Sequence, residues 1–288
     1  MVINIKSINQ ETAIIFFCLL FWNLKFKPRQ MDGYSQSTMA NPLPLKPIEQ
    51  PQTGWMPIPT VANCPPGLEY LTQLDQVLVH QEVSLIEVLL EWEAKNKYRL
   101  KNSVGQQCYF AAEESEVCMR QMCGSSRGFT MHITDNSGAE VIRVTRPFKC
   151  WAGCCWCANA DCCSYNIEIE APVGQVIGRV RQSQSFWYNY FDVQDATGKN
   201  IFTIKGPCCV CPGPCCTCDF PFDIWTKETT PSVIGRVTKQ WSGLTKELFT
   251  DATNFSVTFP IDLDVKMKAV LLGATFLIDM MFFEVDES

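Results

Sequence analysis

Short runs of alternating apolar and polar residues recur through the middle of the chain, joined by turns that contain glycine. Asn102–Gly105, Asp135–Gly138 and Asp195–Gly198 each lie between two such runs. A period of two is the pattern of a half-buried β-strand, and a turn glycine supplies the positive φ that many hairpins need. The pattern therefore predicts a meander of β-hairpins.

The last two hairpins belong to an internal duplication. Each copy continues from its turn through a proline into a cysteine-rich run and then into a strand that contains the sequence VIGRV. Two copies favour a closed barrel built of two halves over a solenoid, which needs more repeats. The matching positions are Asp135, Gly138, Pro147 and 176–180 in the first copy, and Asp195, Gly198, Pro207 and 233–237 in the second.

A helix that is apolar on nearly every side is expected over residues 265–283, with Asp264 as its N-cap. Such a helix is either a membrane span or the core of a domain. A span needs about 20 predominantly apolar residues, and Asp279 interrupts the run. This favours a helix that fills the barrel over a membrane span. The positions expected to face the core or the membrane are Ala269, Leu272, Phe276, Asp279 and Phe283.

The N-terminal part of the chain lacks this periodicity. Residues 1–30 contain an apolar run at 12–24, which is either a signal or anchor segment or an extension that precedes a start at Met31. Residues 31–66 are rich in proline and predict a disordered tail, in which Pro44–Pro47 is a candidate ligand for SH3 or WW modules. Residues 67–288 then form the barrel domain.

Composition narrows the classes of function. The net charge is −6, which argues against nucleic acid as a partner and against nonspecific attraction to anionic lipid as the main driving force. Any membrane attachment is therefore expected to come from apolar or acylated groups. With His80 and His132 as the only histidines, no nucleophile–base pair is suggested. We expect a protein that is not an enzyme.

Most of the 17 cysteines fall in two runs, 150–163 and 208–218. Adjacent cysteines suit a disulfide framework poorly, so we interpret them as reduced thiols open to lipidation or to a metal. A loop of unmodified thiols is a further alternative. The second run has the spacing of a four-thiolate Zn²⁺ site, although its central gap is shorter than in common zinc modules. Its ligands would be Cys208, Cys211, Cys215 and Cys218.

Several strings in the chain are long and distinctive: Asn63–Leu71, Phe110–Glu114, the cysteines of 154–163, Gly206–Cys208, Pro260–Ala269 and Phe276–Asp279. Through these strings the chain resembles the phospholipid scramblase family, over about residues 55 to 285. The resemblance implies a twelve-stranded Tubby-like barrel around a C-terminal helix, and Ca²⁺-activated, ATP-independent, bidirectional movement of phospholipids across a bilayer. We expect this activity at the plasma membrane, with the barrel on the cytosolic side. Homo-oligomers would be one way to build a polar groove for head groups.

The same resemblance implies two kinds of site. The family's Ca²⁺ segment falls on residues 251–262, with Asp251 and Asp262 at its ends, Thr253 where the family usually has Asp, and Ser256 in place of a turn glycine. These departures predict a site of low Ca²⁺ affinity. A hairpin that leads into the last helix is the alternative for this segment. Acylation, as by palmitate, would fall on Cys154, Cys155, Cys157, Cys162 and Cys163.

A second class of function stays open beside lipid transport. The chain would then be an acyl-anchored Tubby-like module that binds lipids or proteins, as a signalling or nuclear-shuttling adaptor. Residues 235–243 resemble an unusual nuclear-import segment and would allow a secondary nuclear pool, although a strand and turn is the stronger interpretation of this stretch.

Overall fold

The computed structural model describes residues 54–62, 64–82, 96–116, 119, 123–149, 152–153, 155–208, 210, 218–240 and 254–284. All of them lie in one compact unit, Pro51–Ser288. The N-terminal extension and the Pro44–Pro47 motif fall outside the described residues, so both stay predictions.

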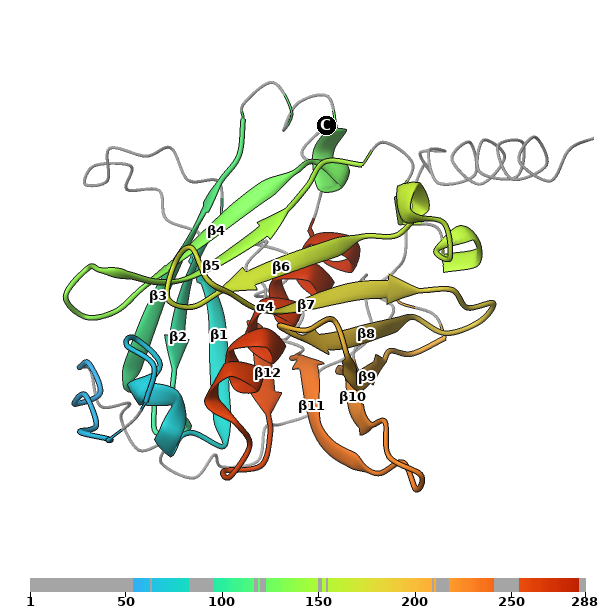
Figure 1. Cartoon of the computed structure of the whole chain (residues 1–288). Helices are drawn as coiled ribbons and strands as arrows, with labels where there is room; N and C mark the ends of the chain where they lie inside the picture. Colours follow the sequence, from blue (N-terminus) through green and yellow to red (C-terminus); the bar gives the residue numbers. More distant parts are fainter. Residues whose placement is uncertain are drawn as a thin grey trace, which may run out of the picture. The chain divides into compact units, whose positions relative to one another are not determined.

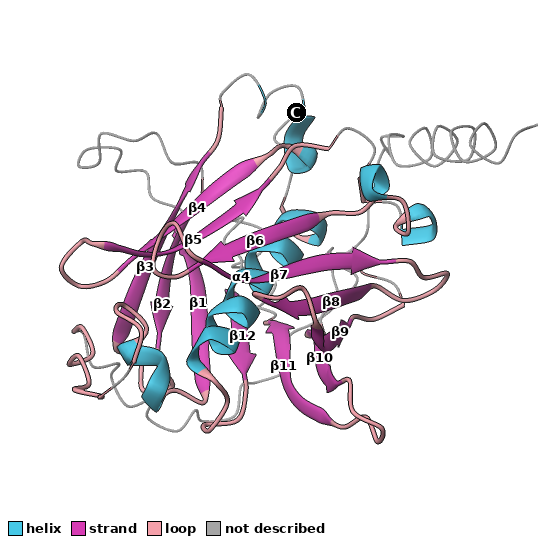
Figure 2. Ribbon diagram, in the orientation of Figure 1, coloured by secondary structure: helices cyan, strands magenta, loops and turns pink. Residues whose placement is uncertain are grey.

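The described residues form a closed antiparallel barrel of twelve strands (Figures 1 and 2). Each strand pairs with its neighbours in the sequence, and β1 closes the barrel on β12. The predicted fold class is thereby confirmed. The strands are β1 Gln76–Glu82, β2 Lys97–Lys101, β3 Gln107–Glu114, β4 Phe129–Thr134, β5 Glu140–Arg146, β6 Asn166–Glu170, β7 Val176–Ser183, β8 Tyr190–Asp195, β9 Asn200–Lys205, β10 Phe220–Thr226, β11 Val233–Lys239 and β12 Asn254–Thr258, with short 3₁₀ helices η2 Glu69–Gln73 and η3 Gly124–Ser126.

The duplicated turns have the same geometry in both copies. The Asp135 carboxylate accepts the backbone N–H groups of the residues two and four positions later, at 2.8 and 3.1 Å. The Asp195 carboxylate makes the corresponding bonds at the same distances. Gly138 and Gly198 close the turns with φ of 79° and 83°, a region that glycine enters without steric cost. The Asp-x-x-Gly pattern therefore predicted these hairpins correctly.

The two VIGRV strands are β7 and β11, and their shared arginine makes the same ion pair. Arg179 Nε lies 2.7 Å from Glu168 on β6, and Arg236 Nε lies 2.5 Å from Asp223 on β10. Gly178 has a packing reason, since a Cβ there would lie 2.6 Å from both a Val270 methyl group and the backbone oxygen of Gln194. The first copy thus uses its glycine to let β7 approach the central helix.

That helix is α4, Val265–Phe282, and it runs through the barrel (Figure 2). Asp264 caps it, as predicted, by accepting the backbone N–H groups of Lys266 and Met267. The helix packs against β6, β7, β8 and β12, and all of its residues from Met267 to Met280 are buried. Among the described residues, none of the helices combines the length and the apolar character that crossing a membrane requires. The five predicted positions are all buried: Ala269, Leu272, Phe276, Asp279 and Phe283.

A buried charged network holds the C-terminal end of α4. Arg127 places Nε and Nη2 at 2.7 and 2.8 Å from the two carboxylate oxygens of Glu113, and Nη2 lies 2.7 Å from Glu284. Asn96 donates a further bond of 2.7 Å to Glu113. Burial opposes the charge of Glu113, but Arg127 outweighs that effect and lowers the carboxyl pKa. Nearby, Tyr98 donates to Asp279 at 2.7 Å, which gives the buried helix aspartate a hydrogen-bond partner.

Lys268 holds the other end of the helix from inside. Its ammonium donates to the backbone oxygens of Leu71, Leu74 and Ile261 at 2.9, 2.8 and 2.8 Å, and its side chain is fully buried. Burial lowers the pKa of this ammonium group. A single side chain therefore joins α4 to η2 and to the segment that precedes the helix.

The two ends of the barrel differ in their connections. Because the strands alternate in direction, every connection from an odd-numbered to an even-numbered strand emerges at one end, which we call the long-loop end. Both cysteine runs belong there, between β5 and β6 and between β9 and β10. The opposite end carries the short turns that were predicted, such as those at Asp135 and Asp195. The cysteine runs are thus equivalent connections, as the duplication implied.

Candidate functional site

The first cysteine run is held in place by short helices and by one lysine. The connection contains the 3₁₀ turns η4 Cys155–Cys157 and η5 Asp161–Cys163. Lys149 donates to the backbone oxygens of Asp161 and Ser164 at 2.7 and 3.1 Å and pairs with the Asp161 carboxylate. The described part of the connection therefore gives each of its four thiols a defined exposure.

The five predicted acylation positions differ in accessibility. The structure exposes Cys162, half-buries Cys155 and buries Cys157 and Cys163. Cys154 lies outside the described residues. No disulfide joins two described cysteines. A thiol must reach solvent to be acylated, so in this conformation the geometry favours Cys162 and Cys155 as acceptors.

The second run is described only in part. Cys208 and Cys218 are exposed, whereas Cys211 and Cys215 lie outside the described residues. Within the part of the chain that the structure describes, no group of three or more His, Cys, Asp or Glu side chains is arranged so that it could hold a metal ion. The Zn²⁺ site at these four cysteines stays a prediction.

The middle of the predicted Ca²⁺ segment forms strand β12. Asp251 and Thr253 lie outside the described residues, whereas Asn254 begins β12 and Asp262 is exposed beyond its other end. Ser256 sits within the ladder, where Gln76 donates to its hydroxyl at 2.6 Å. Ladder strands rise about 3.4 Å per residue, so Asn254 and Asp262 lie at opposite ends of the strand. This arrangement supports the alternative of a strand that leads into the last helix.

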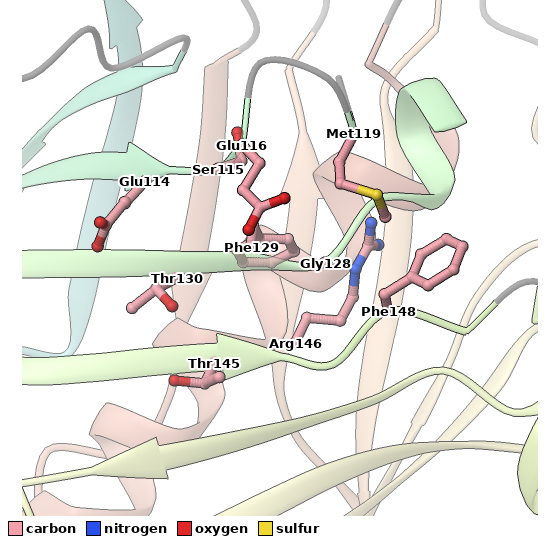
Figure 3. Close-up of a pocket in the computed structure, with 10 residues that line it drawn as sticks. All are labelled: Glu114, Ser115, Glu116, Met119, Gly128, Phe129, Thr130, Thr145, Arg146 and Phe148. Atoms are coloured by element: carbon pink, nitrogen blue, oxygen red, sulfur yellow. The ribbon is translucent and has the colours of Figure 1, made fainter. Parts of the chain in front are cut away.

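A pocket of about 550 Å³ lies beside the first cysteine connection (Figure 3). Arg146 reaches into it from β5, with its guanidinium 4.8 Å from the Phe129 ring and 4.7 Å from the Tyr165 ring. It also donates to the backbone oxygen of Arg127. Burial lowers the pKa of Arg146 to about 10, so it stays charged at neutral pH. The pocket is lined by Glu114, Ser115, Glu116, Met119, Gly128, Phe129, Thr130, Thr145, Arg146 and Phe148.

The histidines have structural partners. His132 lies between two carboxylates, with Nε2 2.8 Å from Glu114 and Nδ1 2.7 Å from Glu140, and Arg143 contacts Glu140 from the other side. His80 Nδ1 lies 2.8 Å from the Asn254 side chain, across the β1–β12 pair. These contacts link neighbouring strands, so both histidines have structural roles in the barrel.

Sequence reasoning missed an aromatic turn between β7 and β8. Phe186, Trp187 and Tyr188 are exposed there, and the Phe186 ring lies against Trp156 of the first cysteine connection. The signal was present, because hairpin turns are normally polar and this one reads SFWYNY. The long-loop end thus combines thiols with exposed aromatic side chains.

A protein-family model described as Scramblase matches residues 55–285. The chain belongs to the phospholipid scramblase family. It is 50% identical to phospholipid scramblase 2 of Bos taurus over 234 residues, and this aligned region covers 81% of this chain and 77% of the relative. It is 49% identical over 231 residues to phospholipid scramblase 1 of Homo sapiens, covering 80% and 70%. Phospholipid scramblase family member 5 of Homo sapiens is 45% identical over 227 residues, covering 79% and 80%. No solved structure matched the chain.

The scramblase match includes the whole barrel, α4 and both cysteine runs, and it confirms the resemblance that the sequence strings carried. For a member of this family, the groups of interest are those that meet lipid. The long-loop end is where the described structure gathers side chains suited to that contact, namely thiols and exposed aromatic rings.

Proposed function

We propose that this protein moves phospholipids between the leaflets of the plasma membrane, in both directions, without ATP and in response to Ca²⁺. The observation that carries the proposal is family membership across residues 55–285. The barrier to be lowered is the cost of taking a polar head group through hydrocarbon. Because α4 fills the barrel, we place the lipid path outside its lumen, and contact between copies of the chain would supply a polar groove.

Reconstitution into liposomes tests this function. With a fluorescent phospholipid in one leaflet, millimolar Ca²⁺ is expected to speed its transfer in both directions, and ATP is expected to change nothing. Such transfer is passive and its net flux follows the lipid gradient, so the rate constants for inward and outward transfer should be equal. Transfer no faster than in protein-free liposomes would sink the proposal.

The same assay tests the Ca²⁺ segment. Asp262→Asn is expected to leave the Ca²⁺ concentration for half-maximal transfer unchanged, because β12 separates Asp262 from the rest of the segment. Asp251→Asn is the matched variant at the other end. If both substitutions raise that concentration equally, the two carboxylates act together and the strand interpretation fails.

We further propose that acyl thioesters at the long-loop end hold the barrel on the cytosolic face of the membrane. In a Cys154→Ser background, Cys155→Ser/Cys162→Ser is expected to remove most of the fatty-acid label carried by the five predicted positions, because these two thiols are the accessible ones among the four that the structure describes. Cys157→Ser/Cys163→Ser is the matched control and should keep most of it. Labelling by a clickable fatty acid in cells measures both, and the reverse order would show that the connection rearranges before acylation.

A tethered module without transport activity is the second candidate function. The enclosure of α4 by the barrel favours it, since this helix is not available as an anchor in the described structure. Hydroxylamine cleaves acyl thioesters. Complete release of the protein from membranes by hydroxylamine, together with inactive liposomes and a nuclear pool, would identify such a module.

A further inference from the structure

Four exposed aromatic side chains form a continuous surface at the long-loop end. We call Trp156, Phe186, Trp187 and Tyr188 the aromatic platform; their exposed fractions are 42, 65, 73 and 41%. Single exposed apolar residues are normal on soluble proteins, whereas a contiguous group marks an interaction surface. The Trp156 and Phe186 ring centroids lie 6.3 Å apart, so two separate connections contribute to one surface.

Hydrogen bonds fix the two connections to each other. The Ser185 N–H donates to the Cys155 oxygen at 2.9 Å, and the Gln184 amide donates to the Trp156 oxygen at 2.7 Å. The Trp156 indole N–H donates to the Phe186 oxygen at 3.1 Å. These bonds satisfy the polar groups beneath the rings and hold the rings in position. A pre-organised surface loses little conformational entropy on binding.

The charges around the platform suit an anionic lipid surface. Although the chain is acidic overall, residues 183–190 carry no acidic side chain. Lys205 lies beneath the platform with Nζ 4.4 Å from the Tyr188 ring centroid. The nearby carboxylates of Asp161 and Asp192 are paired, with Lys149 at 3.1 Å and Lys227 at 3.0 Å respectively. Basic residues close to a membrane are attracted to anionic head groups, and tryptophan and tyrosine favour the interface.

The platform also lies where a membrane contact would be continuous with the proposed acyl anchor. In the barrel order, the β7–β8 turn sits between the β5–β6 and β9–β10 connections, which carry the two cysteine runs. A single acyl chain binds a bilayer only marginally, so stable attachment needs a second contribution. A membrane contact explains why aromatic rings, a lysine and cysteines lie together at this end of the barrel, whereas binding of a protein partner would not require all three.

We propose that the aromatic platform inserts into the interfacial region of an anionic bilayer, independently of acylation, and turns the long-loop end of the barrel toward the membrane. The proposal rests on the proposed function only in taking a membrane as the place of action. The rings would enter the head-group layer, Lys205 would meet lipid phosphates, and the cysteines would be brought to the surface where acyl chains can enter.

Full-length protein made in bacteria, and therefore free of palmitate, tests the platform directly. Phe186→Ser/Trp187→Ser is expected to weaken binding to vesicles of phosphatidylcholine and phosphatidylserine by about tenfold or more, because two large apolar side chains lose their burial in the interface. Cosedimentation measures the binding. Binding should also weaken in high salt and in vesicles of phosphatidylcholine alone.

Val104→Ser/Ile261→Ser is the matched control. These side chains are 60 and 54% exposed and lie at the opposite end of the barrel, so vesicle binding should not change. Thermal unfolding should be the same for both double variants, because all four side chains are largely exposed. Unchanged binding by the platform variant, or an equal loss in the control, would overturn the proposal.

Two further outcomes are separable. If the wild-type chain self-associates in sedimentation equilibrium and the platform variant does not, the platform covers a second copy and the lipid proposal is wrong. If wild-type protein binds vesicles through the platform but fails to move lipid after reconstitution, the platform stands and the proposed function falls.

Discussion

Arg127→Met is expected to lower the free energy of unfolding by about 3–5 kcal/mol, the range seen when one partner of a buried ion pair is removed. Methionine fills similar space, so the loss comes from charge rather than from packing. Glu113 would stay buried with Asn96 as a remaining donor but without the cation that keeps its pKa low. Denaturant unfolding at neutral pH measures the effect.

Acidification provides an independent check on the cause. The lowered pKa of Glu113 means that its pairing stabilises the wild type above the unfolded value of about 4.3, and that this contribution is lost as pH falls through the folded pKa. In the Arg127→Met variant, burial raises the pKa of Glu113 because the Arg127 cation no longer compensates for it. Protonation of Glu113 then removes the cost of burying an unpaired charge. The difference between the two proteins should therefore shrink at low pH.

Two variants separate charge from general damage. Arg127→Met/Glu113→Gln is expected to recover part of the loss, because Glu284 is then the only one of the two carboxylates paired with Arg127 that is left without its cation. Arg99→Met removes one side of the surface pair with Glu82 and should cost less than about 1 kcal/mol. A double variant as unstable as Arg127→Met alone would contradict the ion-pair explanation.

Lys268→Met is expected to lower the free energy of unfolding by about 2–4 kcal/mol, since a buried acceptor that loses its donor costs about 1–3 kcal/mol. Two of its acceptors, the backbone oxygens of Leu74 and Ile261, lie away from the regular ladders. The substitution relieves the burial of a charge, which offsets part of the loss. Thermal and denaturant unfolding measure the difference.

Lys266→Met is the matched control, two residues earlier on the same helix turn and partly exposed. It should change stability by less than about 0.5 kcal/mol, as substitutions at solvated surface positions usually do. If Lys268→Met is as stable as this control, the three hydrogen bonds contribute nothing net and α4 is held by apolar packing alone.

Features decided by local chemistry were predictable from the sequence. Asp135 and Asp195 with their following glycines define turns whose hydrogen bonds lie within five residues, so the pattern alone located the hairpins. The duplication then indicated a closed barrel. For α4, length and the charge at Asp279 were enough to favour a buried helix, because these terms set the cost of membrane insertion whatever the surroundings are.

The candidate site was predictable only in part. The cysteine runs were visible, and their placement at one end of the barrel followed once strand alternation was known. The exposure of the described thiols could not be predicted from the sequence. It depends on the packing of η4 and η5, and on the hydrogen bonds that Lys149 donates to the backbone oxygens of Asp161 and Ser164. The aromatic turn at 186–188 could not be recognised as part of a larger exposed surface, because that surface also includes Trp156, which lies far away in the sequence.

Periodicity, turn chemistry and long matching strings were enough to predict the strand and turn pattern, the duplicated halves, the apolar last helix and the family. The fold was needed to reveal that Lys268 and Arg127 are buried partners of α4, and that exposed rings and thiols lie together at one end of the barrel. Such contacts join residues distant in the chain, and a charged or aromatic residue has the same letter whether the fold buries it or leaves it in water.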